Sequence, residues 1–167
     1  FAEIARECGG GDFTWTTTPE DRTKLWQARH DAYWSAKALR AGAGVVATDV
    51  CVPISRLADC VTETEEDLKR LNLIAPIVGH VGDGNFHLCV LFDPGDTGER
   101  ARAEGLARRI SLRAIAMGGT CTGEHGIGVH KLEALVAEHG EAVDLMRTIK
   151  RALDPRNIMN PGKTVPL

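Results

Sequence analysis

Hydrophobic residues along the chain recur with two spacings, one typical of amphipathic helices and the other of strands. Within residues 18–39, apolar side chains recur every three or four positions, and Thr18 and Pro19 form a typical helix start. The same spacing returns in later segments, two of which follow the glycine-rich stretch 118–128. Helices are therefore predicted at residues 18–39, 54–71, 98–117, 131–138 and 141–153, with the tail of another at 1–8.

Three further segments are short, rich in β-branched or aromatic residues, and bounded by glycine or proline. These predicted strands are residues 45–52, 73–81 and 86–92, and the segment 118–128 is predicted as a strand and loop. From residue 45 to 128 the order is strand, helix, strand, strand, helix, strand. This split βαβ order predicts an α+β fold, a ferredoxin-like antiparallel sheet with helices on one face, plus flanking C-terminal helices.

Composition narrows the class of protein without identifying a chemistry. The 167 residues are 43% hydrophobic and 26% charged, as in ordinary globular domains. A net charge of −3 gives no reason to expect nucleic acid or an anionic membrane as partner. The five cysteines form no CxxC pair, which favours reduced thiols and an intracellular location. Because the chain starts within an apparent helix, we expect it to be the C-terminal piece of a larger protein.

Two histidines lie symmetrically about an Asp-Gly pair in residues 78–87 (VGHVGDGNFH). Asp83-Gly84 is a favoured two-residue hairpin loop, which would set His80 directly opposite His87 on one sheet face. Directly opposed residues have Cβ atoms about 4.5–5.5 Å apart. Two imidazoles held in this way suit a metal ion better than a core, so a metal site is predicted here. The isolated histidines are interpreted as surface residues: His30, His130 and His139.

A second cluster lies in the glycine-rich segment 118–128 (GGTCTGEHGIG). Glycines weaken a strand unless a ligand or another backbone approaches closely. In an extended segment Glu124 and His125 would point to opposite sides, so both could hardly bind one ion. We assign Glu124 as the third metal ligand and His125 as general base. A phosphate-binding loop is the alternative, but no P-loop lysine follows, and Cys121 is interpreted as a packing residue.

A third cluster lies on the helix predicted at 18–39. Arg29 and Tyr33 are four residues apart and share a face with aromatic neighbours. An arginine presented there can bind a carboxylate bidentately, and a solvated arginine on an amphipathic helix is the alternative. A later run of arginines, interspersed with Glu99 and Glu104, is interpreted as a solvated helix face: Arg100, Arg102, Arg108, Arg109 and Arg113.

Four sequence blocks together resemble one known family. They are TDVCVPISRL (48–57), VGHVGDGNFH (78–87), GTCTGEHGIG (119–128) and LDPRNIMNPGK (153–163). They resemble the C-terminal domain of FAD-linked oxidases, in the D-2-hydroxyacid dehydrogenase branch of the vanillyl-alcohol-oxidase family. The first three blocks look most like the cytochrome-type D-lactate dehydrogenases. The resemblance implies that residues 1–167 form the substrate- and metal-binding cap domain, and that the FAD-binding domain is absent from this chain.

The resemblance also implies roles for individual residues. His80, His87 and Glu124 match the divalent-metal ligands, for zinc or manganese, and His125 matches the base that takes the substrate hydroxyl proton. The other matches are Arg29, with Tyr33 on the same face, for the substrate carboxylate, and Asn85 and Asn160 for the flavin.

The implied reaction is oxidation of a small 2-hydroxy acid, with hydride transfer to FAD. Residues 45–48 offer no cation and position 89 is a thiol, which favours D-lactate over D-2-hydroxyglutarate, with glycolate as another alternative. Pyruvate is the expected product. The expected electron acceptor is a cytochrome, a quinone or an electron-transfer flavoprotein, and the expected location is the bacterial cytoplasm or the mitochondrion. A homodimer is the oligomer to test.

Two other functions remain open from the residues alone. A stand-alone metal hydrolase would use the same two histidines and Glu124 with a metal-bound water as nucleophile. A ferredoxin-like binding module would keep the histidines as structural residues only.

Overall fold

The computed structural model describes residues 1–12 and 15–167, which divide into two units at residue 35. The first unit contains α1 (Ala2–Glu7) and α2 (Pro19–His30), and α3 (Ala32–Ala38) crosses the boundary. The second unit contains β1 (Gly44–Ala47), β2 (Val50–Cys51), α4 (Ile54–Leu71), β3 (Ile77–His80), the 3-10 turn η1 (Val81–Asp83), β4 (Asn85–Phe92), α5 (Thr97–Ala116), α6 (Leu132–His139) and α7 (Ala142–Leu153). No helix in the described ranges is long and apolar enough to cross a membrane.

The helix predicted at 18–39 begins as expected but is broken in two. The Thr18 hydroxyl accepts a hydrogen bond from the amide of Asp21, and Pro19 occupies the first helical position. The break falls at Asp31, whose φ and ψ of −83° and −3° end α2. Aspartate is a weak helix former because its side chain competes for local hydrogen bonds, and here it accepts one from Gln27.

The sheet is built around β4, which pairs antiparallel with β3 on one edge and with β1 and β2 on the other. The register of β1 and β2 against β4 is continuous, so the predicted strand 45–52 is one strand interrupted at Thr48 and Asp49. At the interruption the Thr48 hydroxyl accepts the amide of Leu88, in place of a backbone carbonyl. The Thr48 carbonyl is thereby left for another partner.

The glycine-rich segment 118–128 forms much less strand than predicted. Its only pairing with the sheet among the described residues is the bridge between Thr120 and Cys51. The rest of the segment bends, because its glycines allow the chain to turn over the sheet. The order across the sheet is therefore Thr120, then β1 and β2, then β4, then β3. This is the ferredoxin-like order, so the α+β fold class is confirmed.

The hairpin between β3 and β4 does not have the predicted register. His80 pairs with Asn85 and Val78 pairs with His87, because the connection contains four residues rather than two. A distant contact explains the longer loop. Gly84 has φ of 72° and lies against Val52, the residue after β2, where a Cβ atom would be 2.0 Å from the carbonyl oxygen. A shift of two residues keeps every side chain on its predicted face.

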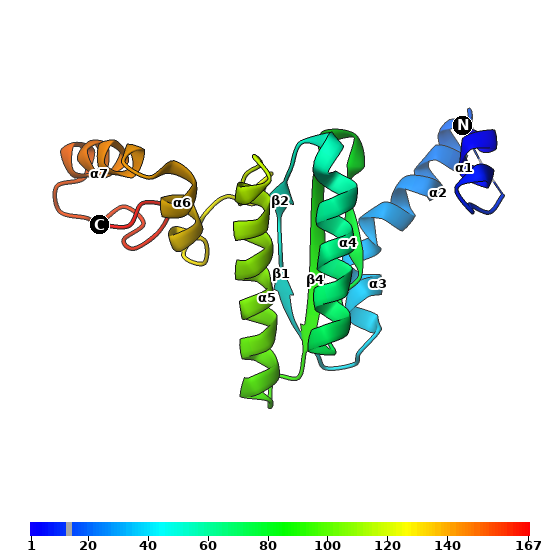
Figure 1. Ribbon diagram of the computed structural model, residues 1–167, viewed down its shortest axis with the longest axis horizontal. Coiled ribbons are helices and arrows are strands. Elements are labelled where there is room, and N and C mark those ends of the chain that lie inside the picture. The colour runs from blue at the N-terminus through cyan, green and yellow to red at the C-terminus, as the bar shows by residue number, and fades with distance from the viewer. Residues whose placement is uncertain (13–14) are drawn as a thin grey trace. The chain divides into compact units, whose positions relative to one another are not determined.

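Helices α4 and α5 cover one face of the sheet (Figure 1), as predicted. Alternate residues of β4 point into this core, and their neighbours point to the opposite face. The fully or almost fully buried core side chains include Val50, Phe86, Leu88 and Val90 from the sheet, with Cys60, Leu106, Ile110 and Ala114 from the helices.

An ion-pair network joins α4 to α5 beside this core. Asp67, almost fully buried, accepts hydrogen bonds from Arg109 at 2.8 Å and Arg113 at 2.5 Å, and also pairs with Arg70. The interpretation of this arginine run as a solvated helix face was wrong for Arg113, whose side chain is 12% exposed, because the sequence does not show that α4 carries a carboxylate facing it. Arg109 pairs with the same carboxylate, but its side chain is 44% exposed, as expected. Burial alone would raise the pKa of Asp67, but the hydrogen bonds from Arg113 and Arg109 outweigh it and lower that pKa.

This depressed pKa makes the stability of the fold depend on pH. The Asp67 contribution is fully present above the unfolded-state pKa and is lost as the pH falls through the folded-state pKa. We predict that Asp67→Asn lowers the free energy of unfolding at pH 7 by about 2 kcal/mol. The difference in the free energy of unfolding between Asp67→Asn and the unmodified protein should shrink as the pH falls from about 4 to about 2. Urea denaturation measures this difference.

The matched control is Glu104→Gln, which breaks the exposed pair between Arg100 and Glu104. Its effect should be below about 0.5 kcal/mol at every pH. A difference for Asp67→Asn that stays constant down to pH 2 would contradict this assignment.

Candidate metal centre

His80 and His87 lie on the sheet face opposite α4 and α5. His87 alternates with the core residues of β4, and His80, at the end of β3, pairs with Asn85 on the same face. The two rings are diagonal neighbours, with centroids 6.2 Å apart and planes at 90°. The His87 side chain is 12% exposed and the His80 side chain 38% exposed, so the pair is anchored in the sheet and open on one side.

Glu124 completes a three-ligand cluster with these histidines. Its Oε1 atom lies 2.9 Å from His87 Nε2 and 3.8 Å from His80 Nε2. Two atoms that each bind one zinc ion at about 2.1 Å are at most about 4.2 Å apart, so both distances fit a shared ion. Two imidazoles and one carboxylate, with one side open, form a donor set typical of catalytic zinc and acceptable to manganese.

The ring of His87 has an oxygen beside each nitrogen. Nδ1 lies 3.3 Å from the Thr48 carbonyl oxygen and 3.5 Å from Asp49 Oδ1, and Nε2 faces Glu124. A neutral imidazole has only one N–H and cannot donate to both. If Nδ1 donates to Thr48, Nε2 presents its lone pair toward Glu124, and a cation between them satisfies both ligand atoms. The interrupted strand therefore orients His87 for metal binding.

His125 lies beside the ligands, contrary to the expectation that it would point away from Glu124. Its ring stacks on His87, with centroids 4.8 Å apart and planes at 14°, and its Nε2 is 4.0 Å from Glu124 Oε1. The expectation assumed an extended segment, whereas residues 121–127 bend instead of running as a strand. An imidazole half exposed at the edge of a metal site can exchange a proton with a bound ligand.

Asp49 was missed by the sequence analysis and is the most strongly hydrogen-bonded group at the site. Its fully buried carboxylate accepts from the amides of Glu124 at 3.0 Å and His125 at 2.8 Å. The Thr122 hydroxyl at 2.8 Å and the Asn85 amide at 2.9 Å also donate to it. Burial alone would raise the pKa of Asp49, but these hydrogen bonds hold it well below its usual range.

Lys131, also missed, supplies the positive charge beside Asp49. Its Nζ donates to the Asp49 carbonyl oxygen at 2.7 Å and lies 3.6 Å from the carboxylate. Burial lowers the pKa of Lys131, although the nearby Asp49 carboxylate acts in the opposite direction and raises it.

One sequence signal could have identified Asp49. It is a charged residue within the mostly apolar predicted strand 45–52.

A second cluster, Asp49, His87 and His125, also has ligand atoms close enough for one ion. It is the weaker candidate. Oδ2 of Asp49 already accepts three hydrogen bonds and Oδ1 accepts one, so an ion would have to share an oxygen that already has protein donors.

Asn85, which pairs with His80 in the sheet, carries a buried polar atom without a hydrogen-bond partner among the described residues. Its amide nitrogen donates to Asp49 and to the Val50 carbonyl, while its Oδ1 is buried with no hydrogen-bond partner in the described structure. A buried unsatisfied acceptor next to a candidate metal site is suited to an N–H of a ligand. This supports the predicted flavin contact without testing it.

The other predicted binding residues lie elsewhere in the chain. Arg29, on α2 in the first unit, stacks over the Trp26 ring at 5.4 Å, and Tyr33 lies edge-on to Trp34 at 5.3 Å. Asn160 is exposed in the C-terminal tail, with φ of 47°. Their assigned roles at the substrate and the flavin stay predictions.

Cys121 does not act as an activated thiol. It is fully buried, and burial together with a hydrogen bond to Glu138 raises its pKa to about 12. The interpretation of Cys121 as a packing residue is therefore confirmed.

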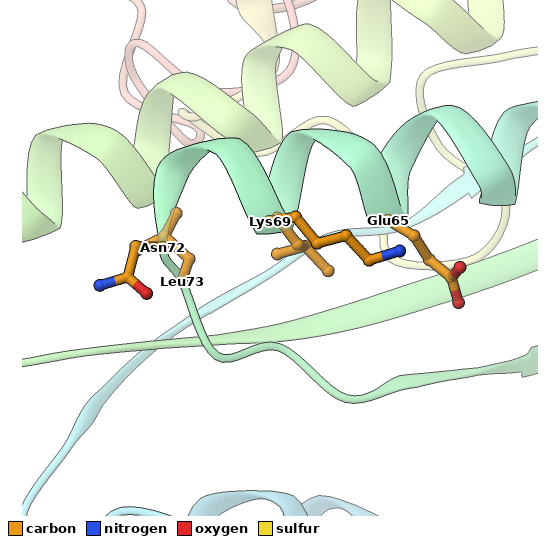
Figure 2. Close-up of a pocket in the computed structure, with 5 residues that line it drawn as sticks. Glu65, Lys69, Asn72 and Leu73 are labelled. Carbon is orange, nitrogen blue, oxygen red and sulfur yellow. The ribbon is translucent and has the colours of Figure 1, made fainter.

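A surface hollow of about 480 Å³ lies at the C-terminal end of α4, lined by Glu65, Leu68, Lys69, Asn72 and Leu73. Figure 2 shows Glu65 and Lys69 side by side along the helix, with Asn72 and Leu73 where the helix ends. None of the ligand candidates lines it. The open sheet face around His87 therefore remains the candidate site.

Comparison with known proteins agrees with the four sequence blocks. The family model described as "FAD linked oxidases, C-terminal domain" matches residues 1–164. A protein of Danio rerio named a probable mitochondrial D-lactate dehydrogenase is 52% identical over 99% of this chain and 33% of its own length. The mitochondrial D-lactate dehydrogenase (cytochrome) of Arabidopsis thaliana is 42% identical over 98% of this chain and 29% of its own length. The glycolate oxidase subunit GlcD of Escherichia coli is 30% identical over 98% of this chain and 33% of its own length. The chain thus spans about a third of the length of these relatives.

The donor set makes a direct prediction about metal binding by the chain. His87→Ala should weaken Zn²⁺ or Mn²⁺ binding by more than about 100-fold, beyond the 10–100-fold typical of changes outside the ligand shell. Isothermal titration calorimetry measures this. His139→Ala, which removes an exposed histidine outside the cluster, should leave the affinity unchanged. Equal affinity in the two variants would eliminate the proposed site.

Proposed function

The chain belongs to the family of FAD-linked oxidase C-terminal domains, and from this premise we propose that it is the substrate- and metal-binding part of an FAD-dependent D-2-hydroxyacid dehydrogenase. The proposed reaction is oxidation of D-lactate to pyruvate, with hydride transfer from the substrate Cα to the flavin. The observation that carries the proposal is the cluster of His80, His87 and Glu124 with His125 stacked beside it.

The chain contributes binding, orientation and proton transfer to this reaction. A divalent ion held by His80, His87 and Glu124 would supply a Lewis acid that lowers the pKa of the substrate hydroxyl. His125 is the base that takes the hydroxyl proton at Nε2, and its stacking on His87 keeps that nitrogen beside the ligand cluster. FAD, bound by the rest of the parent protein, supplies the hydride acceptor.

Arg29 and Tyr33 are proposed to hold the substrate carboxylate, and Asn85 and Asn160 to contact the flavin. An arginine can bind a carboxylate through two parallel hydrogen bonds, which fixes the orientation of the acid. The unsatisfied Oδ1 of Asn85 supports a ligand contact at that position. No comparable observation supports Asn160 beyond its match to the family.

The side chains beside His87 favour a small uncharged substituent on the substrate. Cys89, two residues after His87 on the same face, is almost fully buried and pairs with Ala47. Neither residue offers the charge or amide that the second carboxylate of D-2-hydroxyglutarate would require. This supports D-lactate as substrate, and the likeness to a glycolate oxidase subunit keeps glycolate as the alternative.

Relatives named as cytochrome D-lactate dehydrogenases support a cytochrome as electron acceptor, with a quinone or an electron-transfer flavoprotein as alternatives. Because several of these relatives are named as mitochondrial, we propose the mitochondrion as the location if the source is eukaryotic. A homodimer stays an untested prediction.

We predict that the 167-residue chain alone contains less than stoichiometric flavin after purification and does not oxidise D-lactate. The reason is that the sequence contains no phosphate-binding GxGxxG segment. Absorbance at the flavin bands measures the flavin content. Stoichiometric FAD in the isolated chain would contradict the prediction.

In the full-length protein that contains this chain, His125→Asn should lower the rate of flavin reduction by D-lactate by about 10²–10⁴-fold, because the base is lost. Stopped-flow absorbance measures this rate. His139→Ala is the matched control and should react at the unmodified rate. If D-2-hydroxyglutarate reduces the unmodified flavin faster than D-lactate does, the proposed substrate is wrong.

A further inference from the structure

The loop that carries Glu124 and His125 is held from within by the Thr122 hydroxyl, which hydrogen-bonds the amide and carbonyl of Gly126. Both side chains are about half exposed, and residues 121–127 belong to no helix or strand. The backbone amides of Glu124 and His125 instead donate hydrogen bonds to the carboxylate of Asp49, which lies 75 and 76 residues earlier in the sequence.

We propose that Asp49 is the positioning residue of the metal centre, holding the Glu124–His125 peptide over the sheet. Its carboxylate does not touch the ion or the substrate in this assignment. It acts through the backbone of the ligand Glu124 and of the base His125. The inference rests on the proposed function for the identity of ligand and base, but the clamp itself rests only on the hydrogen bonds.

The distribution of donors explains why a carboxylate is required at this position. Oδ2 accepts from the Thr122 hydroxyl and from the amides of Glu124 and His125, and Oδ1 accepts from the Asn85 amide. An ionised carboxylate offers about four acceptor positions on two oxygens. An asparagine offers one oxygen, and its NH₂ group would meet a donor on one side.

The loop packs closely against Asp49 and Asn85 at Gly123, where a side chain has no room. A Cβ atom on Gly123 would lie 2.0 Å from Asn85 Nδ2 and 3.0 Å from Asp49 Oδ1. Lys131 follows the loop in sequence, and its Nζ donates a hydrogen bond to the Asp49 carbonyl oxygen. The sheet, the glycine loop and the start of α6 therefore meet at one buried charge.

The test compares Asp49→Asn with Asp67→Asn, a second buried aspartate that binds arginines and contacts no site residue. Backbone amide hydrogen exchange is measured by NMR in the metal-free chain, and Zn²⁺ affinity is measured by calorimetry. In Asp49→Asn, the amides of Glu124 and His125 should exchange at least about tenfold faster, as expected for lost charge-assisted hydrogen bonds. Zn²⁺ affinity should fall about 10–100-fold.

Asp67→Asn should leave both readouts at the site unchanged while lowering overall stability. Unchanged exchange at Glu124 and His125 in Asp49→Asn overturns the inference, and so does an equal loss of Zn²⁺ affinity in both variants. If the unmodified chain binds no Zn²⁺, the proposed function loses its metal, and the exchange comparison still decides the clamp.

A second pair of variants decides the matter if Asp49→Asn does not fold. Thr122→Val removes one donor to Asp49 together with the hydroxyl's hydrogen bonds to the amide and carbonyl of Gly126, whereas Thr122→Ser keeps the hydroxyl. Faster exchange at Glu124 and His125 as well as at Gly126 in Thr122→Val, restored in Thr122→Ser, supports the inference. Faster exchange confined to Gly126, or identical exchange in both variants, overturns it.

Discussion

The arrangement of the site depends on one buried charge, the carboxylate of Asp49. A buried ionised group is costly unless it is paired and hydrogen-bonded, so the structure has to bring donors to it. Two of these donors are the amides of Glu124 and His125, from a loop far along the chain. The strand interruption that admits Asp49 also directs the Thr48 carbonyl toward His87. The features that orient a metal ligand and a base therefore follow from two adjacent residues of one strand.

Much of the fold could be predicted from periodicity because it depends on local patterns. The helix predicted at 54–71 was found with those bounds, and the one at 98–117 differs by one residue at each end. The hairpin register was wrong by two residues, since it is set by the packing of Gly84 against Val52, which no local pattern reveals. The prediction that His80 and His87 share a face was confirmed nonetheless, because a shift of two preserves the alternation of side chains.

The candidate site could be predicted only in part. His80, His87, Glu124 and His125 stand in recognisable segments, and the structure brings them together. Asp49 could not be assigned a partner from the sequence, because its donors lie 36 to 76 positions away and become neighbours only in the folded structure. The same is true of the pairing of Asp67 with Arg109 and Arg113, which lie on another helix and were interpreted as part of a solvated face. Where a charge is satisfied across the fold, spacing along the chain carries no information about its partner.

The central claim is that His80, His87 and Glu124 form one metal site whose geometry Asp49 maintains from outside the ligand shell. A crystal structure of the Zn²⁺-loaded chain, with anomalous diffraction recorded at the zinc edge, tests this most directly. We expect one strong peak about 2.0–2.2 Å from an imidazole nitrogen of each histidine and a carboxylate oxygen of Glu124. The Asp49 oxygens should remain on the amides of Glu124 and His125. A zinc ion bound instead by Asp49, His87 and His125, or no zinc on this face of the sheet, would contradict it.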